Sequence, residues 1–440
     1  MSMERLMELK KEMLSCSRCS LCKMVPLPVA LAPDYTDACP ASHHFHFHGY
    51  SGSGKQIMAL SMLEERIKAD QVMADTVFAC TTCGYCDVAC KFHMDAERNL
   101  VNMAFREHLV EDGYAREGHL QALNNINLHG HYLGSLERSR GTWAEGLGLK
   151  VLPEEKADVL LFAGCSQQSD DQAADVVRKL ARIMQHAAVD VGILGDTEPC
   201  CGLEAHWRGA RKPFEEIAAN NVQLFDTLGV SKVVVASGSC LGTFRSKYPE
   251  YASALNVEVV DATEFLIQLV ENDRLKLKKP VKATVTYHDP CYLGRQGETY
   301  FKSEAGEEKL ALNVMTYTDP PKKMRYGVNG CYDAPRKLLE AIPSLKFKEL
   351  HRIKEYALCC GGGGGVPDIY PEMAQATTLH RLDEVLDVGA ELIVTSCAKC
   401  EKQFGSVLKD ASANSASQAY QNLDICDVIE LVYKSAGIKE

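Results

Sequence analysis

The chain has 440 residues, of which 46% are hydrophobic and 24% charged, and its formal net charge is −11. A chain of this length is too long for one hydrophobic core, so we expect two or three domains. The negative charge and the lack of a basic stripe argue against a nucleic-acid partner, and no apolar run approaches the ~20 residues that a membrane-spanning helix needs.

Cysteine is the unusual component, with 19 residues. The first residues, MSMERLMELKKEM, do not have the pattern of a signal peptide, so we expect a chain that is not exported. In such a chain, thiols clustered at short spacings indicate metal binding rather than a disulfide framework.

Two cysteine runs lie in the first hundred residues. The sequence CTTCGYCDVAC has the C-x2-C-x2-C-x3-C spacing of a cubane [4Fe–4S] site, and CSRCSLC followed by a distant CP pair resembles it. Structural zinc sites are the alternative, but zinc favours C-x2-C pairs over triplets. Because the fourth cysteine of a run typically reaches the other cluster, we assign one cluster to Cys16, Cys19, Cys22 and Cys90, and a second to Cys80, Cys83, Cys86 and Cys39.

The segment between the two runs is predicted to be helical. Residues 54–70 carry apolar side chains at helical spacing (Ile57, Leu60, Leu63 and Ile67), which favours a helical ferredoxin domain over residues 1–100. Two motifs in this region are not assigned a ligand. GYSGSGK resembles a phosphate-binding loop, but Gln56 stands where the loop needs a hydroxyl. HHFHFH is predicted to form a strand-like turn that packs Phe45 and Phe47.

Residues 101–150 are predicted to be a partly helical connector, after which the sequence repeats itself. The first half contains ADVLLFAGC, EPCCG and SKVVVASGSC, and the second contains VKATVTYHDPC, YALCCGG and AELIVTSCAKC. A charged insertion at residues 297–329 accounts for the greater length of the second half. The repeat predicts two similar units, residues 151–280 and 281–440.

Each unit alternates strand and helix patterns. Residues 158–164, 189–194 and 232–237 are continuous apolar runs, as in strands that are buried on both faces. Residues 171–185 and 213–229 have the pattern of amphipathic helices. This alternation predicts a parallel, doubly wound arrangement. Most of the clustered thiols follow a strand, so we expect them to meet at the carboxyl edge of the sheet.

The motifs HDPCYLGR, YDAPRKLLEAIP, CCGGGGG and CAKC resemble those of the cysteine-rich CCG-domain iron–sulfur oxidoreductases. This family includes the D-type subunits of heterodisulfide reductases and cytoplasmic subunits of transmembrane redox complexes of sulfate reducers. The resemblance covers nearly the whole chain. It implies an α/β fold with an N-terminal α-helical ferredoxin-like domain and duplicated, doubly wound CCG units. It also implies a noncubane [4Fe–4S] cluster on five cysteines: Cys291, Cys359, Cys360, Cys397 and Cys400.

The chemistry of neighbouring residues suggests roles for them at this cluster. Gly361, Gly362 and Gly363 would let backbone approach the cluster and would offer N–H groups to its sulfides. His288 is a candidate proton donor or acceptor, with a buried hydrogen bond as the alternative. Arg295 and Arg336 are candidates for holding a substrate carboxylate.

The first unit departs from the family pattern. It keeps four cysteines, but Thr243 stands where the last C-x2-C partner is expected, and Gly202 is the only glycine after the CC pair. These thiolates suit a cubane cluster, a modified cluster or a relic of one, and the sequence leaves this open: Cys165, Cys200, Cys201 and Cys240. Cys331 and Cys426 lack partners and are expected to be structural, with Cys426 in a terminal helix.

The implied function is an iron–sulfur subunit of a membrane-associated respiratory complex. Electrons would pass through the two cubanes to or from the noncubane site, with heterodisulfide-reductase-like thiol/disulfide chemistry there. One alternative is a pure conduit between a partner flavin dehydrogenase (glycolate, lactate or glycerol-3-phosphate type) or a cytochrome and the quinone pool. A zinc-stabilised scaffold without a redox role is another.

The implied partners are other redox proteins. The sequence has no flavin or nicotinamide fingerprint, so electrons would enter and leave through an integral membrane cytochrome b or quinone-linked subunit and other redox subunits. The chain would then be cytoplasmic, held on the inner face of the cell membrane by its partners.

Overall fold

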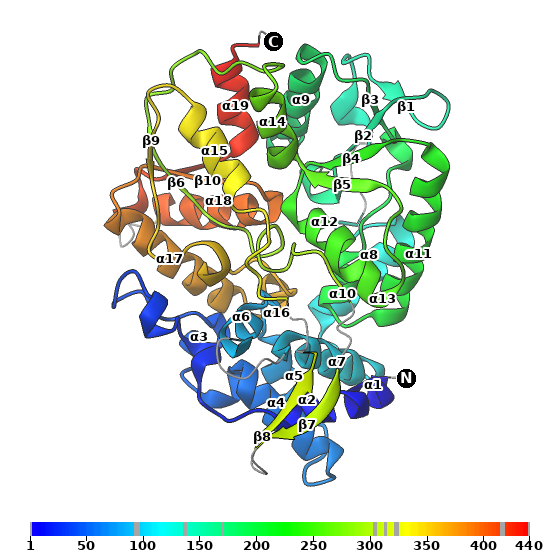
Figure 1. The fold of residues 1–440 in the computed structure, drawn as a ribbon, viewed down its shortest axis with the longest axis vertical. Coiled ribbons are helices and arrows are strands. Elements are labelled where there is room, and N and C mark those ends of the chain that lie inside the picture. Colours follow the sequence, from blue (N-terminus) through cyan, green and yellow to red (C-terminus); the bar gives the residue numbers. More distant parts are fainter. Residues whose placement is uncertain are drawn as a thin grey trace.

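The computed structural model describes residues 2–91, 97–134, 139–168, 170–301, 306–311, 315–320, 325–413 and 419–438. Figure 1 shows a helical N-terminal part at the bottom and two α/β parts above it. Each upper part contains a parallel sheet with flanking helices, which confirms the predicted mixed α/β class.

The N-terminal part consists of helices around the two cysteine runs. The predicted helix is α4 (Gly52–Leu63), but it ends before Ile67, which is 40% exposed. Its buried face contains Gln56, Ala59 and Met62 rather than the predicted isoleucine and leucine row. The other helices of this part are α1 (Ser2–Glu8), α2 (Lys10–Leu14), α3 (Pro40–Phe45), α5 (Gln71–Phe78), α6 (Tyr85–Lys91) and α7 (Arg98–Glu111). Helix α8 (Glu117–His129) follows and packs against helices of the two α/β parts.

The prediction of a strand-like turn at HHFHFH is wrong. Helix α3 covers the first part of this motif, and Phe45 stacks on Tyr50 with ring centroids 4.0 Å apart. Phe47 lies on the surface, 66% exposed. Pro40 is the first residue of α3. An N–H group at this position has no acceptor within the helix, so proline, which lacks the N–H, is favoured there, and the CP pair marks the start of a helix.

Helix α7 belongs to the N-terminal part, not to a connector. It packs against α1, α4 and α5, and its Phe105 and Leu109 lie in the same buried cluster as Phe78 of α5. The boundary expected near residue 100 therefore falls inside a helix. The sequence of α7 contains no glycine or proline that would mark a break there.

The first α/β part contains a five-stranded parallel sheet in the order β1-β3-β2-β4-β5. Its strands are β1 (Lys150–Val151), β2 (Val159–Phe162), β3 (Val191–Ile193), β4 (Lys232–Val235) and β5 (Glu258–Asp261), and the three predicted runs are β2, β3 and β4. The helices are α9 (Asp171–His186), α10 (Leu203–Trp207), α11 (Arg211–Leu228), α12 (Gly238–Gly242), α13 (Tyr248–Tyr251) and α14 (Ala262–Glu271), and the two predicted helices are α9 and α11.

The second α/β part contains a four-stranded parallel sheet in the order β11-β10-β6-β9. Its strands are β6 (Thr284–Tyr287), β9 (Lys346–Lys348), β10 (Leu392–Thr395) and β11 (Asp424–Asp427). Cys426 lies in β11, so its predicted place in a helix is wrong. The helices are α15 (Asp333–Ala341), α16 (Val366–Ile369), α17 (Pro371–Asp387), α18 (Ala398–Ala413) and α19 (Val428–Ala436).

The two sheets share one buried core. The cluster includes Leu161 and Val234 from the first sheet and Val285 and Val394 from the second. Helices α9 and α14 of the first part contact α19 and α15 of the second, and they lie between the sheets in Figure 1. Burial of apolar surface on both sides therefore holds the two α/β parts in one fixed arrangement.

The loops that follow the strands also touch each other. The N–H of Gly238 in the first part donates to the carbonyl oxygen of Ser396 in the second, at 3.0 Å. A Cβ at Gly238 would lie 2.6 Å from the Cβ of Leu293, so only glycine permits this approach. The carboxyl ends of strands from both sheets thus face one another.

Part of the predicted insertion forms a separate hairpin. Strands β7 (Glu307–Ala311) and β8 (Met315–Asp319) pair antiparallel, and Figure 1 draws them across the N-terminal part. At the base of the insertion, the Glu298 carboxylate accepts hydrogen bonds from the Gly327 N–H and the Asn329 side chain, at 2.5 and 2.7 Å. Residues 302–305, 312–314 and 321–324 of this segment lie outside the described residues.

A buried N-cap carboxylate makes stability depend on pH. Asp261 caps α14, and burial raises its pKa from 3.8 to about 7 despite hydrogen bonds from Thr263. Because the folded state binds this proton more tightly than the unfolded state, stability falls as the pH rises from about 4 to about 7. We expect Asp261→Asn to raise the free energy of unfolding above pH 7 by on the order of 2 kcal/mol. Melting temperatures between pH 5 and 9 test this, and parallel curves for the two proteins would contradict it.

Candidate iron–sulfur centres

The first group of cysteines lines one small cavity. Cys16, Cys19, Cys22 and Cys90 border it together with Ser53 and Arg98. The Nε–H of Arg98 donates to Cys90 Sγ at 3.0 Å, and Cys22 Sγ lies 3.6 Å from the Ser53 hydroxyl. Cys19 is exposed, so this cavity lies near the protein surface.

The second group lines a neighbouring cavity. Its border contains Cys39, Cys80, Cys83 and Cys86, and Cys22 of the first group contributes to the same wall. Gly52, at the start of α4, lies between the two groups. A Cβ there would come 2.8 Å from the Cβ of Cys86 and 3.5 Å from that of Cys22. Only a residue without a side chain lets the two groups approach this closely.

Cys83 of the second group is buried and its other three cysteines are partly exposed, and desolvation opposes the ionisation of the Cys39 and Cys86 thiols. Burial raises the pKa of Cys39 to about 12, although the ammonium group of Lys55 acts in the opposite direction. Burial also raises the pKa of Cys86 well above its usual value. A metal ion or cluster reverses this balance, because it binds and stabilises thiolates. Four convergent thiols in an enclosed cavity therefore fit an iron–sulfur cluster.

The third group gathers five cysteines from separate parts of the second α/β part. Cys291 follows β6, Cys397 and Cys400 follow β10, and Cys359 and Cys360 precede α16. Their side chains form one continuous series of contacts, in the order Cys291, Cys359, Cys360, Cys400 and Cys397. The Cys400 side chain and two N–H groups at the start of α18 lower the pKa of Cys397 to about 6, against the effect of burial.

The glycine run has two functions in the structure. The N–H groups of Gly361 and Gly362 point at Cys359 Sγ and Cys360 Sγ, with N–S distances of 3.4 and 3.5 Å. Gly363 and Gly364 instead pack against the N-terminal part, where a Cβ would collide with the backbone of Thr81 and Cys80. Gly361 and Gly364 also have φ angles of +97° and +68°, which favour glycine. The first glycines of the run therefore direct N–H groups at the thiols, and the later glycines allow the close contact between the second α/β part and the N-terminal part.

His288 lies beside the third group without a hydrogen-bond partner. One of its ring nitrogens lies within 4.8 Å of the Cys360 and Cys400 sulfurs, and the ring packs edge-on against Phe404. Among the described residues, neither ring nitrogen has a partner, although the side chain is buried. Burial and the nearby Arg381 lower the pKa of His288 to about 3. A neutral imidazole with unused nitrogens is suited to donate to a group that binds at these cysteines.

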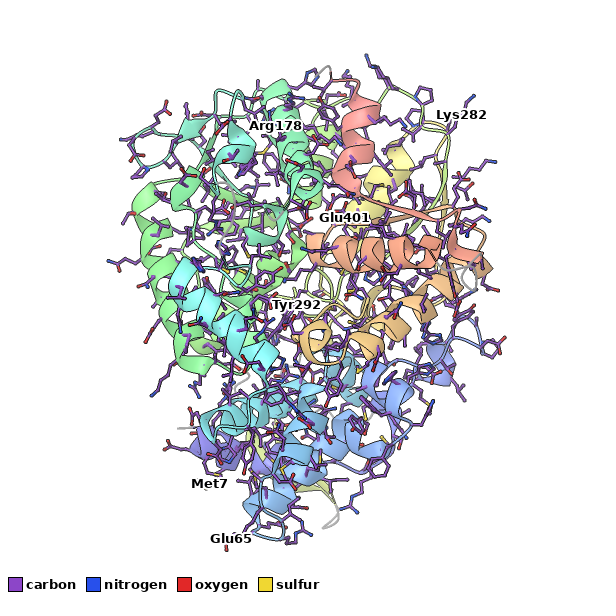
Figure 2. All side chains as sticks on the ribbon, turned by 180° about the vertical axis from the view of Figure 1, so that it is seen from behind. Met7, Glu65, Arg178, Lys282, Tyr292 and Glu401 are labelled. Carbon is purple, nitrogen blue, oxygen red and sulfur yellow. The ribbon has the colours of Figure 1, made fainter. Side chains whose placement is uncertain are left out.

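The second and third groups touch each other. Cys83 of the N-terminal part and Cys359 of the second α/β part lie in one buried cluster, close enough for their side chains to interact. Tyr292, near the centre of the molecule in Figure 2, marks the same junction. Its hydroxyl accepts a hydrogen bond from Trp207 Nε1 at 2.7 Å, and it also contacts Thr82. All three parts therefore meet beside the third group.

The fourth group lies in the first α/β part. Cys165 and Cys200 Sγ atoms are 3.7 Å apart, and contacts continue from Cys200 to Cys201 and from Cys201 to Cys240. Thr243, at the position of the missing C-x2-C partner, turns its hydroxyl to the carbonyl of Ser239. Four buried thiols thus converge here, without a fifth from that position.

The two arginines predicted to hold a substrate are occupied within the protein. Arg336 forms ion pairs with Asp289 and Glu349, at 2.7 and 2.6 Å. Arg295 donates to backbone carbonyls of Cys83, Glu355 and Ala357. The guanidinium of Arg336 is thus already paired with two carboxylates, whereas Arg295 uses three of its five N–H donors on the backbone, so a carboxylate-binding role for Arg295 stays a prediction.

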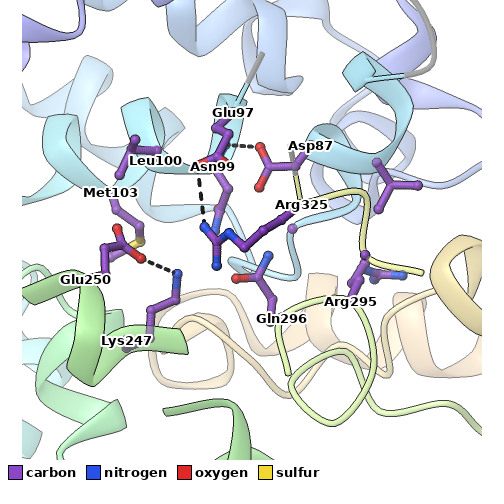
Figure 3. Close-up of a pocket in the computed structure, with 13 residues that line it drawn as sticks. Asp87, Glu97, Asn99, Leu100, Met103, Lys247, Glu250, Arg295, Gln296 and Arg325 are labelled. Carbon is purple, nitrogen blue, oxygen red and sulfur yellow. Dashed lines mark hydrogen bonds and ion pairs between the residues drawn. The ribbon is translucent and has the colours of Figure 1, made fainter. Parts of the chain in front are cut away.

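A small charged cavity lies where the three parts meet. Figure 3 shows Asp87, Glu97 and Asn99 from the N-terminal part facing Lys247 and Glu250 from the first α/β part and Arg325 from the second. Arg325 pairs with Glu97 at 3.4 Å, and Lys247 pairs with Glu250 at 2.9 Å. The cavity volume of about 20 Å³ suits one water molecule, not a substrate.

One functional candidate was missed in the sequence. Lys399 lies inside the CAKC motif, has a side chain that is 13% exposed, and pairs with Glu204, two residues after Gly202 of the first unit. It also lies above the rings of Tyr132 and Trp207. A lysine between two cysteines is an ordinary sequence feature, and only the tertiary contact with Glu204 shows that its charge joins the two cysteine groups.

The remaining two cysteines stand apart from the four groups. Cys331 is buried, and its Sγ lies 3.6 Å from the Thr263 hydroxyl. Cys426 lies in β11. Within the described ranges, no helix combines the length and the apolar character that crossing a bilayer requires.

Comparison with known proteins finds two domain families in this chain. A 4Fe-4S dicluster domain matches residues 12–94, and the cysteine-rich domain CCG matches residues 159–245 and 315–405. The second CCG match begins after Cys291, so this cysteine lies outside it. The match to the dicluster domain identifies the N-terminal part as a ferredoxin-like iron–sulfur domain.

Several curated proteins are similar over most of the chain. The D-type subunit of the dihydromethanophenazine:CoB–CoM heterodisulfide reductase of Methanosarcina barkeri is 29% identical over 88% of this chain and 82% of its own length. "Probable iron-sulfur-binding oxidoreductase FadF" of Bacillus subtilis is 26% identical over 88% of this chain and 50% of its own. "EtfAB:quinone oxidoreductase" of Syntrophomonas wolfei is 28% identical over 85% and 48%.

The chain spans about half the length of the last two relatives and most of the first. The chain therefore contains a 4Fe-4S dicluster domain and two cysteine-rich CCG domains, and over most of its length it is similar to the D-type subunit of a heterodisulfide reductase.

Proposed function

We propose that the protein is the electron-transferring iron–sulfur subunit of a larger redox complex. Cys16, Cys19, Cys22 and Cys90 would hold one cubane [4Fe–4S] cluster, and Cys39, Cys80, Cys83 and Cys86 a second. Cys291, Cys359, Cys360, Cys397 and Cys400 would hold a noncubane [4Fe–4S] cluster. When bound, the cubanes supply one-electron transfer, and the noncubane cluster supplies thiol/disulfide chemistry that needs two electrons.

The contact between Cys83 and Cys359 is the observation that carries this proposal. It links a cysteine of the second cubane group to a cysteine of the noncubane group, across the boundary between two parts of the molecule. The shared wall at Cys22 links the first and second groups in the same way. A series of adjacent thiol groups is the arrangement that stepwise electron transfer requires.

The two α/β parts are proposed to be duplicated CCG units, residues 151–280 and 281–440. The strand order β9-β6-β10-β11 corresponds to β3-β2-β4-β5 in the first sheet. Both units also place a buried aspartate, Asp261 or Asp427, as the cap of the helix after their last strand. The four thiols of the first unit are proposed to hold a further cluster.

Thiol/disulfide chemistry is the finer part of the proposal, and His288 supports it. The ring lies beside Cys360 and Cys400, and both of its nitrogens lack partners among the described residues. It would donate a hydrogen bond to a sulfur at this centre, and its neighbour Asp289 would keep its backbone in place through Arg336 and the Lys354 N–H. The glycine N–H groups would stabilise negative charge on the same cysteines.

A pure electron conduit is the second candidate, and the large cavity between the α/β parts favours it. This cavity measures about 780 Å³ and reaches Ser166 and Ala398, each next to a cysteine. Its described lining contains no cysteine side chain. For either function, we propose that partner redox subunits exchange the electrons, including a membrane cytochrome b or a quinone-linked subunit, and that the chain lies at the cytoplasmic face of the membrane.

Metal analysis and turnover test the two levels of the proposal. Anaerobically purified protein is expected to contain iron and sulfide and to give EPR signals after reduction; zinc in a colourless protein would contradict any redox role. With reduced viologen as donor, disulfide reduction is expected in the wild type and is expected to fall to the background rate in Cys397→Ala. Equal rates would leave electron transfer in place and reject chemistry at the third group.

A further inference from the structure

Seven buried arginines of the described chain fall into two classes. Four pair with carboxylates: Arg208 with Glu204, Arg336 with Asp289, and Arg352 and Arg381 with Glu384. The other three are Arg98, Arg106 and Arg295, which are at most 6% exposed and form no ion pair with a described carboxylate. A buried guanidinium without a counter-charge is strongly destabilising, so an anion must balance each of these three charges.

The hydrogen bonds of these arginines do not supply that anion. Arg106 donates to the backbone carbonyls of Val77, Phe78, Cys80 and two residues from the α/β parts, Trp207 and Gly364. Arg295 likewise donates to three carbonyls. Carbonyl oxygens satisfy the N–H donors but carry no net charge, so the positive charge itself remains unbalanced.

Each of the three arginines lies next to at least one of the cysteine groups. Arg98 donates to Cys90 Sγ of the first group. Arg106 interacts electrostatically with Cys80 of the second. A lysine behaves in the same way: Lys55, from the GYSGSGK motif, is 1% exposed, lines the cavity of the second group and donates to the carbonyl of Tyr50. Cysteine-ligated clusters are anions, so they are the counter-charges that fit.

Arg295 differs from the others because it faces two groups at once. Its charge interacts with Cys83 of the second group and with Cys291 and Cys359 of the third. The Nε–H is bonded to the carbonyl of Cys83 at 2.6 Å, and one terminal nitrogen to that of Ala357 at 2.7 Å. Figure 3 shows Arg295 at the edge of the three-part junction. The guanidinium is therefore fixed between the two proposed centres.

We infer that Arg295 is a positioning residue that raises the reduction potentials of both the second cubane and the noncubane cluster. The inference rests on the proposed function. A cluster becomes one unit more negative when it accepts an electron, so a fixed positive charge beside it stabilises the reduced form. A charge that lies beside both centres raises both reduction potentials, so the difference between them, which drives electron exchange, changes less than either value.

Redox titrations followed by EPR test this inference. In Arg295→Met, we expect the reduction equilibrium of both centres to shift about tenfold towards the oxidised form, which is about 59 mV for a one-electron couple. In Arg295→Lys, which keeps the charge, we expect values near those of the wild type. Arg98→Met is the matched control, and it should shift only the centre of the Cys90 group.

Each outcome decides for or against the inference. Loss of one of the two centres in Arg295→Met but not in Arg295→Lys also supports the inference, because the Lys variant keeps a positive charge facing the backbone carbonyls. Unchanged potentials with both centres present would overturn it and leave the proposed function intact. Equal shifts of the potentials in Arg295→Met and Arg295→Lys would also overturn the inference. So would insolubility of both Arg295 variants when Arg98→Met is soluble, because either result assigns Arg295 a purely structural role. A wild-type protein without iron would instead overturn the proposed function.

Discussion

Replacing Cys359 by alanine is expected to remove the noncubane centre and to leave the two cubanes in place. Cys359 is the second of the five cysteines in the series of contacts, where its side chain contacts those of Cys291 and Cys360 as well as that of Cys83. The variant should lose about four iron atoms per chain, together with the corresponding EPR signal. Iron analysis and EPR of the anaerobically purified variant measure both quantities.

Cys331→Ala is the matched control for this experiment. Cys331 is buried to a similar degree, 6% exposed against 2% for Cys359, but its sulfur contacts the Thr263 hydroxyl and lies outside the four groups. The control should keep the full iron content. An equal loss of iron in the two variants would mean that the effect comes from disturbed packing, and an unchanged iron content in Cys359→Ala would exclude Cys359 as a ligand.

Replacing Glu384 by alanine is expected to cause the largest loss of stability. The carboxylate is 0% exposed and pairs with two buried guanidinium groups, Arg381 at 2.5 Å and Arg352 at 3.1 Å. Burial alone would raise the pKa of Glu384, but the two arginines outweigh it and lower the value. Removing the carboxylate leaves two buried charges without a partner, so we expect a loss of about 3–5 kcal/mol in the free energy of unfolding.

The effect should extend to the contact with the N-terminal part, because Arg352 also donates to the carbonyl of Asp37. Thermal or urea denaturation measures the loss of stability. Glu271→Ala provides the comparison, since its ion pair with Lys337 is 53% and 58% exposed on the two sides and should contribute less than about 1 kcal/mol. Similar destabilisation of both variants would mean that the buried ion pairs of Glu384 with Arg381 and Arg352 contribute no more to stability than an exposed ion pair.

Local patterns predicted part of the secondary structure. An apolar run or a helical period is a property of neighbouring residues, so these patterns predicted the strands β2, β3 and β4 and the helices α9 and α11. The errors were also local in origin. The start of α3 at Pro40 was overlooked, and the end of α4 before Ile67 followed from burial of a different helix face.

By itself the sequence predicted the two N-terminal cysteine sets, because short spacings constrain where neighbouring thiols can point, whereas the set of five in the second unit was implied by the family resemblance. The two N-terminal sets line two separate cavities, and the five thiols of the second unit form one series of contacts. Their role as ligands remains a proposal.

Only the tertiary structure decided how these sets relate to one another. The contact of Cys83 with Cys359, the unpartnered ring of His288 and the position of Arg295 between two groups all depend on residues that are far apart in the chain. Spacing along the sequence carries no information about such distances. They are set by the shared core of the two sheets and by glycines that let the backbones of the three parts come into contact.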